Sequence, residues 1–371
     1  MYGNLAYGHS ANEQLPLFHL AAGVTSVLSP GSGNPEGEIA LRNRIDAGDS
    51  AGPRIFAAGE YIEMAPTRAP GMPTVETREE ARLKINHWAS RGADAIKIYA
   101  GMRGEILDAA VARAHAHGAR VTAHLGATGW ADAIRSGVDV IYHGVYSFPE
   151  IEPEWMDPKA IGMINFAPPE FDKYYKAIVE ADLSQPKIRE LFRLAAAAKV
   201  VFVPTVVALE PYDAEKQRMP DQKQFYSAEG WQVVEKRLQS PKKQYAVLLT
   251  KKNMEFVRLA HEAGCMLSTG TDLTNFQILP GFALWREIEL FAEAGLKPMD
   301  VLRAATFNGA YAVGRSDSLG TVEGGKLADF VILNANPLEN ISNVRSVHRV
   351  VKGGVVYDPQ ELLKRLKGRV H

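Results

Sequence analysis

Short runs of β-branched and other apolar residues alternate with longer amphipathic patterns along most of this chain, and this alternation constrains the fold more than any other feature. The short runs predict buried strands at residues 24–28, 54–58, 95–99, 121–124, 139–143, 200–206 and 265–272. The longer patterns predict helices, among them residues 77–91, 104–117, 187–198, 241–263 and 279–294. A strand followed by a helix is the unit of parallel sheets, and seven or eight such units favour an α/β fold of the closed (β/α)8 type, the TIM barrel.

An open, doubly wound sheet is the alternative fold for such a pattern. Its first strand is normally followed by a Gly-rich loop that binds phosphate. Residues 29–35 are rich in glycine, but they lack the GxGxxG pattern, and Pro35 removes a backbone donor there. The sequence therefore favours the barrel.

The pattern changes after Gly314. Residues 319–333 and 347–357 are hairpin-like β segments with glycine turns, and a helix is expected near residues 359–366. These segments predict a small sheet and a terminal helix appended to the barrel.

Two long insertions, at residues 144–186 and 209–240, interrupt the alternation. Both follow predicted strands, so we expect them over the carboxyl end of the barrel, where substrates of such barrels bind. Their many prolines and aromatic residues favour ordered lids over disordered linkers.

The composition excludes several classes of function. Lys and Arg number 42 against 43 Asp and Glu, so the formal charge of −1 offers no basic excess for nucleic acid. The longest apolar stretch, near residues 194–209, is too short to cross a membrane, and the first residues lack the pattern of a signal peptide. The single Cys265 excludes an internal disulfide and a Cys-based metal site. The sequence thus predicts a cytoplasmic protein with a small-molecule or dipeptide-like substrate and no nucleic-acid or membrane partner, and it leaves open whether copies form a homo-oligomer.

Strand alternation places ionisable side chains at the carboxyl ends of four predicted strands. Lys97 faces the barrel lumen if its isoleucine neighbours face the helices, and His124 shares the inward face of its own strand. The same rule predicts that His143 shares an inward face with residues 139 and 141, and that Asp272 shares one with residues 268 and 270. Catalytic residues of such barrels lie at this end of the strands.

Each of these residues also has a structural interpretation. A lone histidine at a strand end is usually a core or loop residue, and a lone aspartate before a loop is usually an Asx turn or a helix cap. Lys97 differs, because an unpaired ammonium inside a barrel costs several kcal/mol, so it must be paired, neutral or modified. The combination of the four residues, rather than any one of them, supports a functional site.

Together the four residues have the chemistry of a metal site. Imidazole nitrogens and carboxylate oxygens bind zinc and similar divalent ions, and a neutral lysine can take up carbon dioxide to form a bridging carbamate. A metal-bound water is a nucleophile near neutral pH, and Asp272 is the expected catalytic residue that accepts its proton and passes it to a leaving nitrogen. We predict that Lys97, His124, His143 and Asp272 bind one or two divalent ions, with zinc expected and iron, manganese and cobalt left open.

The motifs around these residues resemble those of the amidohydrolase superfamily. IKIY with Lys97, VTAHLG with His124, YHG with His143 and STGTD with Asp272 are similar to the metal positions on strands 4, 5, 6 and 8 of that family. The resemblance is greatest to imidazolonepropionase-like and Xaa-Pro-dipeptidase-like members.

Three longer segments extend this resemblance over nearly the whole chain. Residues 20–27 and 52–59 are similar to the second and third strand segments of the family, and residues 305–333 to the stretch where its barrel gives way to a β-sandwich. The resemblance implies a barrel with strands 2 to 8 over residues 1–316, and part of a β-sandwich plus a terminal helix over residues 317–371. It also implies hydrolysis of an amide-type C–N bond, in a peptide, an N-acyl amino acid or a cyclic amide, at a metal centre of one or two ions.

The family's first strand carries a His-x-His pair, which by this pattern would fall before residue 1. His9 and His19 stand alone and in a different register. His115 and His117 have the spacing, but on a helix these positions point about 200° apart and cannot bind one ion, so we expect both on the surface near a helix C-terminus. We expect either a start codon placed too far downstream, in which case upstream residues could encode a secretion signal, or an N-terminally truncated, catalytically impaired chain. The open edge of a seven-stranded barrel favours the first.

Three residues close to the predicted ligands are candidate substrate contacts, namely Tyr99, Tyr146 and Thr205. Packing at the barrel rim is an equal alternative for the two tyrosines, and Tyr142 is expected to face the helices. Two other functions stay open: a barrel enzyme in which Lys97 forms a Schiff base with a carbonyl substrate, and a non-catalytic barrel kept for binding after loss of its metal site.

Overall fold

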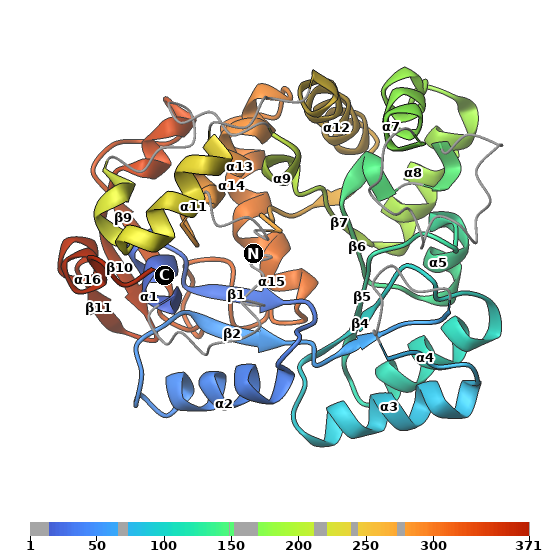
Figure 1. Ribbon diagram of the computed structural model, residues 1–371, viewed down its shortest axis with the longest axis horizontal. Helices are drawn as coiled ribbons and strands as arrows, with labels where there is room; N and C mark the ends of the chain where they lie inside the picture. Colours follow the sequence, from blue (N-terminus) through green and yellow to red (C-terminus); the bar gives the residue numbers. More distant parts are fainter. Residues whose placement is uncertain are drawn as a thin grey trace.

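The computed structural model describes residues 15–65, 73–147, 149–151, 170–210, 221–238, 244–272 and 279–370. In this part of the chain, parallel strands form two sheets (Figure 1). The strands are β1 Ser26–Ser29, β2 Arg54–Ala57, β3 Tyr61–Ile62, β4 Ala95–Ile98, β5 Arg120–Ala123, β6 Val140–Tyr142, β7 Val201–Val203 and β8 Met266–Leu267. β1 pairs with β2, and β3 to β8 pair in chain order, which is the strand order of a β/α barrel.

Helices precede, connect and follow these strands. The α-helices up to the C-terminal sheet are α1 Leu15–Ala21, α2 Pro35–Asp46, α3 Arg78–Ser90, α4 Gly104–Ala116, α5 Trp130–Ser136, α7 Glu170–Glu180, α8 Pro186–Ala198, α9 Val206–Leu209, α11 Ala228–Leu238, α12 Gln244–Glu262, α13 Ala283–Glu293, α14 Pro298–Ala305 and α15 Phe307–Ala312. Short 3-10 helices are η1 Gly144–Ser147, η2 Pro149–Ile151 and η3 Gln222–Phe225. Among the described residues, no helix combines the length and apolar character needed to cross a bilayer.

The predicted α/β barrel is confirmed, and all seven predicted strands occur, most of them shorter than expected. One strand was missed. β3 follows β2 after a break at residues 58–60, and β2 pairs with β1 whereas β3 pairs with β4. Two short strands in sequence thus pair with different neighbours, where the sequence predicted a single strand.

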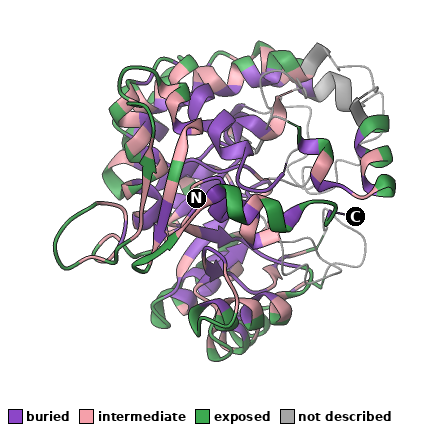
Figure 2. Cartoon of the chain, turned by 90° about the vertical axis from the view of Figure 1, so that its left-hand side faces the viewer, coloured by how far each residue is buried: buried purple, intermediate pink, exposed green. Residues whose placement is uncertain are grey.

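The strands separate two apolar layers, and the buried interior is visible in Figure 2. Ile96, Ile98 and Ile141 belong to the large cluster between the strands and the outer helices. The lumen of the barrel holds a smaller cluster, made of Leu28, Phe56, Ala58, Ala95, Val140, Tyr142, Val201, Val203, Ala310, Ala312 and Leu319.

One end of the lumen is closed by helix α15. Its residues Ala310 and Ala312 share the lumen cluster with Ala95, Val140 and Val201, which are the first residues of β4, β6 and β7. Because α15 covers the amino ends of the strands, their carboxyl ends lie at the opposite end of the barrel.

The C-terminal segment forms the predicted small sheet and helix. Strands β9 Phe330–Leu333, β10 Val347–Lys352 and β11 Val355–Tyr357 are antiparallel, with η4 Ile341–Arg345 between β9 and β10, and α16 Pro359–Leu366 follows. α16 packs beside α1 (Figure 1). Arg54 of β2 also forms an ion pair with Asp329 at 2.5 Å, which joins the sheet to the barrel. The division of the chain at residues 316 and 317 stays a prediction.

Candidate active site

Lys97 of β4 lies inside the barrel, as the alternation predicted. Its side chain is buried, and its Nζ atom lies 4.2 Å from the ring centroid of Tyr142 and 5.8 Å from that of Tyr99. The Nζ atom of Lys97 therefore lies against aromatic rings inside the barrel.

His124 and His143 lie side by side at the carboxyl ends of β5 and β6. Their ring centroids are 4.4 Å apart, and both residues are buried, with exposed fractions of 4% and 3%. The ring of Tyr99 lies 4.9 Å from that of His124. Tyr99 therefore lies beside His124, and its role as a substrate contact stays a prediction.

The prediction that His143 shares an inward strand face with residues 139 and 141 is wrong. Ile141 packs in the outer layer and Tyr142 in the lumen, so the inward face of β6 is the opposite of the one predicted. His143 has a φ of +82°, a left-handed backbone conformation that ends the strand and breaks the alternation. The turn brings its imidazole to the same end of the barrel as His124.

Asp272 also reaches the site through irregular backbone rather than through a strand. β8 ends at Leu267, so the predicted strand over residues 265–272 is too long, and Asp272 has a φ of +38°. Thr205, directly before α9, has a φ of +50°. Among the described residues, five other than glycine have positive φ, and three of them are His143, Thr205 and Asp272. Such conformations cost about 1–3 kcal/mol each and persist only where the surrounding structure enforces them.

One imidazole connects these three strand ends. The Nδ1 atom of His143 lies 3.2 Å from Oγ1 of Thr205 and 3.6 Å from Oδ2 of Asp272. All three side chains are largely shielded from solvent. The carboxyl ends of β6, β7 and β8 therefore meet at His143, which places Thr205 as a partner of this histidine.

Tyr61 of β3 belongs to the same region and was missed by the sequence analysis. Its ring centroid lies 5.1 Å from that of Tyr99. Burial raises the pKa of Tyr61, and the nearby Tyr99, Asp272 and Glu38 raise it further. The only sequence signal was an aromatic residue just after a predicted strand, which is too common to be specific.

A buried acid on α2 lies near these groups. Ser29, the last residue of β1, donates a hydrogen bond from Oγ to the carboxyl group of Glu38, with 2.9 Å to each oxygen. Burial raises the pKa of Glu38 to about 7, although the hydrogen bonds from Ser29 and Ser32 oppose this shift. Glu38 is therefore a titratable group near neutral pH that the strand pattern did not indicate.

The donor chemistry of the site fits a divalent metal ion. Two imidazoles and one carboxylate lie together, and Lys97 of the adjacent strand β4 lies near the rings of Tyr99 and Tyr142. Within the described ranges, no group of three or more His, Cys, Asp and Glu side chains has the spacing of a metal cluster. The ligand set predicted from the sequence thus stays a prediction.

The remaining candidates fall outside this cluster. His115 lies 2.9 Å from Asp139 and His117 lies 2.8 Å from Asn86, so the two histidines bond to different partners near the end of α4, in line with the surface role expected for them. The side chain of Tyr146 and all of His9 lie outside the described residues. His19, in α1, is buried, and burial lowers its pKa to about 4.

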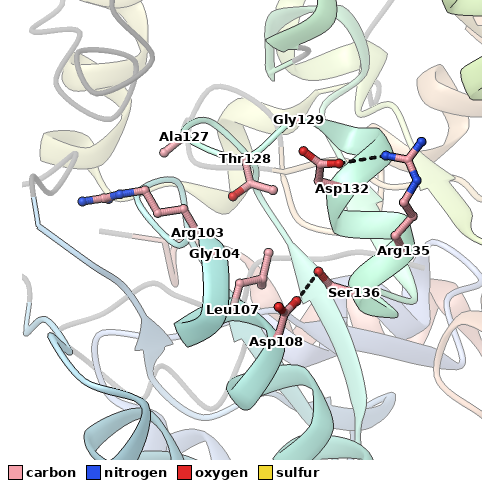
Figure 3. Close-up of a pocket in the computed structure, with 10 residues that line it drawn as sticks. All are labelled: Arg103, Gly104, Leu107, Asp108, Ala127, Thr128, Gly129, Asp132, Arg135 and Ser136. Atoms are coloured by element: carbon pink, nitrogen blue, oxygen red, sulfur yellow. Dashed lines mark hydrogen bonds and ion pairs between the residues drawn. The ribbon is translucent and has the colours of Figure 1, made fainter.

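A cleft of about 720 Å³ lies between the loops that follow β4 and β5 (Figure 3). Figure 3 shows an ion pair between Asp132 and Arg135 and a hydrogen bond from Ser136 to Asp108 along its wall. The residues that line it are Arg103, Gly104, Leu107, Asp108, Ala127, Thr128, Gly129, Asp132, Arg135 and Ser136. None of the predicted metal ligands is among them.

Comparison with known proteins connects this chain and its fold to one group of proteins. A model of the amidohydrolase family matches residues 187–357. Imidazolonepropionase of Bacteroides fragilis is 36% identical over 104 residues, which cover 26% of this chain and 24% of that protein. The imidazolonepropionase of Symbiobacterium thermophilum is 42% identical over 74 residues, 20% of this chain and 17% of that protein. The matched segment therefore spans about a quarter or less of these curated relatives.

Solved structures match over a larger share of the chain. A Xaa-Pro dipeptidase with bound methionine in the active site has a TM-score of 0.67 and 26% sequence identity, over 93% of this chain and 78% of that chain. Bottromycin amidohydrolase has a TM-score of 0.71 at 20% identity, over 98% of this chain and 77% of that chain, which supports the fold alone. The fold is that of the barrel proteins of this group. These comparisons support the assignment of the chain to the amidohydrolase superfamily.

Proposed function

We propose that this protein is a metal-dependent hydrolase that cleaves an amide-type C–N bond in a peptide, an N-acyl amino acid or a cyclic amide. The observation that supports this most is the convergence of His124, His143 and Asp272 at the carboxyl ends of three barrel strands, with Lys97 on the adjacent strand β4. The superfamily and the names of the similar proteins, a dipeptidase and imidazolonepropionases, support the same bond type.

In this proposal, Lys97 as a carbamate, His124, His143 and Asp272 hold one or two divalent ions, with zinc expected. When bound, such an ion lowers the pKa of water and polarises a carbonyl group. Asp272 accepts a proton at Oδ2 from the attacking water and passes it to the leaving nitrogen. Thr205 orients the imidazole of His143 through its Oγ1 contact.

The aromatic residues of the site form the proposed substrate wall. Tyr99 packs between His124 and Tyr61, and both tyrosine rings present apolar faces next to the proposed ligands. Tyr146 stays a candidate contact from the loop after β6. We propose a small-molecule or dipeptide-like substrate and a cytoplasmic location for the chain as written.

Metal content and activity of the full chain test this proposal. The protein is stripped of metal, incubated with zinc, freed of excess ion and analysed for bound zinc, then assayed on Xaa-Pro and other dipeptides, N-acyl amino acids and an imidazolone. We expect one to two zinc ions per chain, activity that a chelator abolishes, and loss of zinc in His143→Ala and His124→Ala. His115→Ala is the matched control and should keep its zinc.

Two results would overturn the proposal. One is a wild-type chain that binds no zinc or other divalent ion and hydrolyses none of these substrates. The other is full activity in the presence of chelator, which together with trapping of a substrate on Lys97 by borohydride would favour Schiff-base chemistry instead.

A further inference from the structure

The left-handed backbone of His143, Thr205 and Asp272 needs an explanation in the surrounding structure. These residues, which we call the left-handed strand ends, follow three neighbouring strands, β6, β7 and β8. L-residues rarely adopt such conformations, and they persist where neighbouring groups fix them. Two buried polar side chains outside the proposed metal site contact all three segments.

Asn253 of α12 connects the segments after β6 and β7. Its side chain is fully buried, its Oδ1 accepts a hydrogen bond from the backbone N–H of Val145 at 3.1 Å, and its Nδ2 donates to the carbonyl of Pro204 at 2.9 Å. Val145 lies two residues after His143, and Pro204 directly precedes Thr205. The amide of Asn253 therefore holds the backbone just after His143 and just before Thr205.

The approach of Asn253 to the backbone is close. A Cβ atom at Gly144 would lie 2.0 Å from Oδ1 of Asn253, and Gly144 has a φ of +53°. Only glycine at this position lets the amide reach Val145. The absence of a side chain at Gly144 therefore leaves the space that the amide of Asn253 occupies.

Glu287 of α13 connects the segments after β7 and β8 in the same way. It is fully buried, Oε1 accepts from the backbone N–H of Val206 at 3.1 Å, and Oε2 accepts from that of Val207 at 2.7 Å. The backbone of Gly270 also hydrogen-bonds to it. Val206 directly follows Thr205, and Gly270 lies two residues before Asp272.

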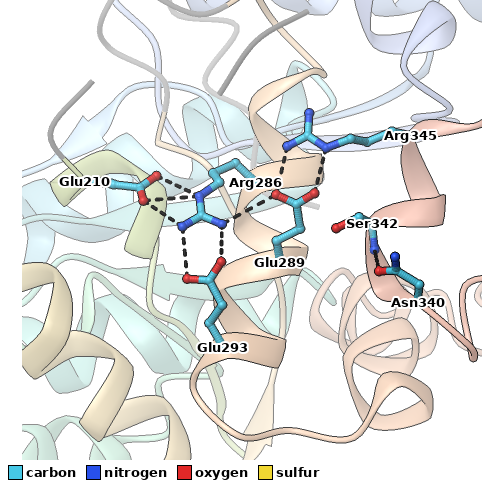
Figure 4. Close-up of polar contacts among 7 residues, drawn as sticks. All are labelled: Glu210, Arg286, Glu289, Glu293, Asn340, Ser342 and Arg345. Carbon is cyan, nitrogen blue, oxygen red and sulfur yellow. Dashed lines mark hydrogen bonds and ion pairs between the residues drawn. The ribbon is translucent and has the colours of Figure 1, made fainter. Parts of the chain in front are cut away.

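The neighbouring residue on α13 strengthens this connection. Arg286, only 4% exposed at its side chain, donates from Nε and Nη2 to Glu210, the residue directly after α9 (Figure 4). Helix α9 is thus held at its start by Glu287 and just past its end by Arg286. This fixes the segment that begins at Thr205 at both ends.

We propose that Asn253 and Glu287 are positioning residues, two buried side chains that hold the left-handed strand ends and thereby aim His143, Thr205 and Asp272 at a common point. The proposal rests on the proposed function for what these residues act upon. The hydrogen bonds of the two side chains form one connected series from β6 to β8. A buried polar side chain needs hydrogen-bond partners, but these partners need not lie on neighbouring strand ends.

Isosteric variants separate positioning from general stability. Glu287→Gln replaces one acceptor oxygen by an NH2 group that faces a backbone N–H, and Asn253→Asp removes the donor to Pro204. The matched controls are Glu289→Gln, a buried acid two residues away whose partners are Arg345 and Arg286, and Asn343→Asp, an amide of η4 that likewise donates from Nδ2 to a backbone carbonyl, that of Asn336. Glu287→Asp, which keeps the carboxylate, serves if the glutamine variant does not fold.

Zinc affinity, measured with Zn²⁺ alone by competition with a chromophoric chelator, is the first readout. We expect about 10–100-fold weaker binding in Glu287→Gln and Asn253→Asp, as for other groups that orient ligands, and unchanged affinity in the two controls. Wild-type affinity in both folded test variants would overturn the proposal. An equal loss in the controls would also overturn it, because it would show general destabilisation.

Amide hydrogen exchange is the second readout, and it needs neither metal nor activity. We expect faster exchange at Val206, Val207 and Gly270 in Glu287→Gln, and at Val145 in Asn253→Leu, which unlike Asn253→Asp removes the acceptor of the Val145 N–H, with no change at these amides in the controls. If the wild-type chain binds no zinc and has no activity, the proposed function fails, while exchange still decides the positioning role. Unchanged exchange in both variants would reject it.

Discussion

Removal of the Arg286 guanidinium tests how much the contacts of α13 contribute to the fold. Arg286 bonds to Glu210 with atom distances of 2.7, 2.9 and 3.2 Å, and to Glu293 at 2.5 and 3.0 Å (Figure 4). Burial lowers the pKa of Arg286, but its bonds to Glu210 and Glu293 raise it overall, so the group stays charged. Arg286→Met keeps the length of the side chain and removes the charge.

Two of its three acidic partners decide the cost, because the third, Glu289, lies farther away at 3.5 Å and also pairs with Arg345. Glu210 is 10% exposed at its side chain and Glu293 is 47% exposed. Breaking a buried ion pair from one side costs about 3–5 kcal/mol. A half-exposed pair contributes at most about 1 kcal/mol because solvent screens it. We therefore expect Arg286→Met to lower the free energy of unfolding by about 4 kcal/mol, most of it from the arginine lost beside Glu210.

Replacing Glu210 instead of Arg286 costs less, because Arg286 still pairs with Glu293 after Glu210 is replaced. We expect Glu210→Gln to cost about 2 kcal/mol, and the double variant to cost about 4 kcal/mol rather than the sum. The difference, about 2 kcal/mol, is the coupling energy of the pair. At about 2.1 cal/mol/K per residue of unfolding entropy, a loss of 4 kcal/mol lowers the melting temperature of a chain of this length by roughly 5 °C.

Urea denaturation followed by circular dichroism, with thermal unfolding as a second probe, measures all four proteins. Arg258→Met on α12 is the matched control, because Arg258 pairs with Glu262 at side-chain exposures of 45% and 55%, and it should cost about 0.5 kcal/mol or less. If Arg286→Met cost no more than this control, or if the two changes were additive, the buried pair would not stabilise the fold as argued here.

Three further changes test other buried groups. His19 has a folded pKa of about 4, below its usual 6.5. Its contribution to stability is therefore complete above pH 6.5 and is lost as the pH falls through 4. Urea denaturation over this pH range should show a loss of ~3 kcal/mol in the free energy of unfolding, and His19→Leu should abolish this pH dependence. Glu38 has a folded pKa of about 7, above its usual 4.5. Its contribution to stability is therefore complete below pH 4.5 and is lost as the pH rises through 7, again by ~3 kcal/mol. Glu38→Gln should remove this pH dependence from the free energy of unfolding measured in urea. Gly144→Ala should lower the free energy of unfolding in urea by about 2–4 kcal/mol, because the added Cβ would meet Asn253. The control Gly104→Ala, at a φ of +54° with open space around it, should cost about 1 kcal/mol. Equal losses in the two variants would contradict the contact between Gly144 and Asn253.

The periodicity of the sequence predicted the fold because each strand buries one regular run. Lys97 and His124 lie where alternation placed them, since β4 and β5 keep the extended conformation through Ile98 and Ala123. β3 was missed because Tyr61 and Ile62 are too few residues to show a period. The same periodicity also indicated α16, whose predicted and observed limits coincide.

Alternation failed where the backbone leaves the extended region. At His143 and Asp272 the residues were identified correctly, but the predicted inward faces rested on regular strands that end earlier, at Tyr142 and Leu267. A left-handed conformation at a residue other than glycine has little local sequence signal, because the residue itself disfavours it. Residue type therefore indicated the chemistry at these two positions, whereas the path of the chain could not be derived from residue order.

The cause of these conformations lies in residues distant in sequence. Asn253 follows His143 by 110 positions and Glu287 follows Thr205 by 82, so no local pattern connects either pair. A faint signal exists, since the apolar residues of the LWREIELF segment predict a buried helix α13, and a buried helix face normally carries no acidic side chain such as Glu287. An acidic side chain on such a face is costly unless backbone donors meet it, and here Val206 and Val207 do so. Polar residues on the inner faces of barrel helices are therefore the positions at which to look for groups that hold strand ends, because the energetic cost of burying them requires a partner that only the tertiary fold supplies.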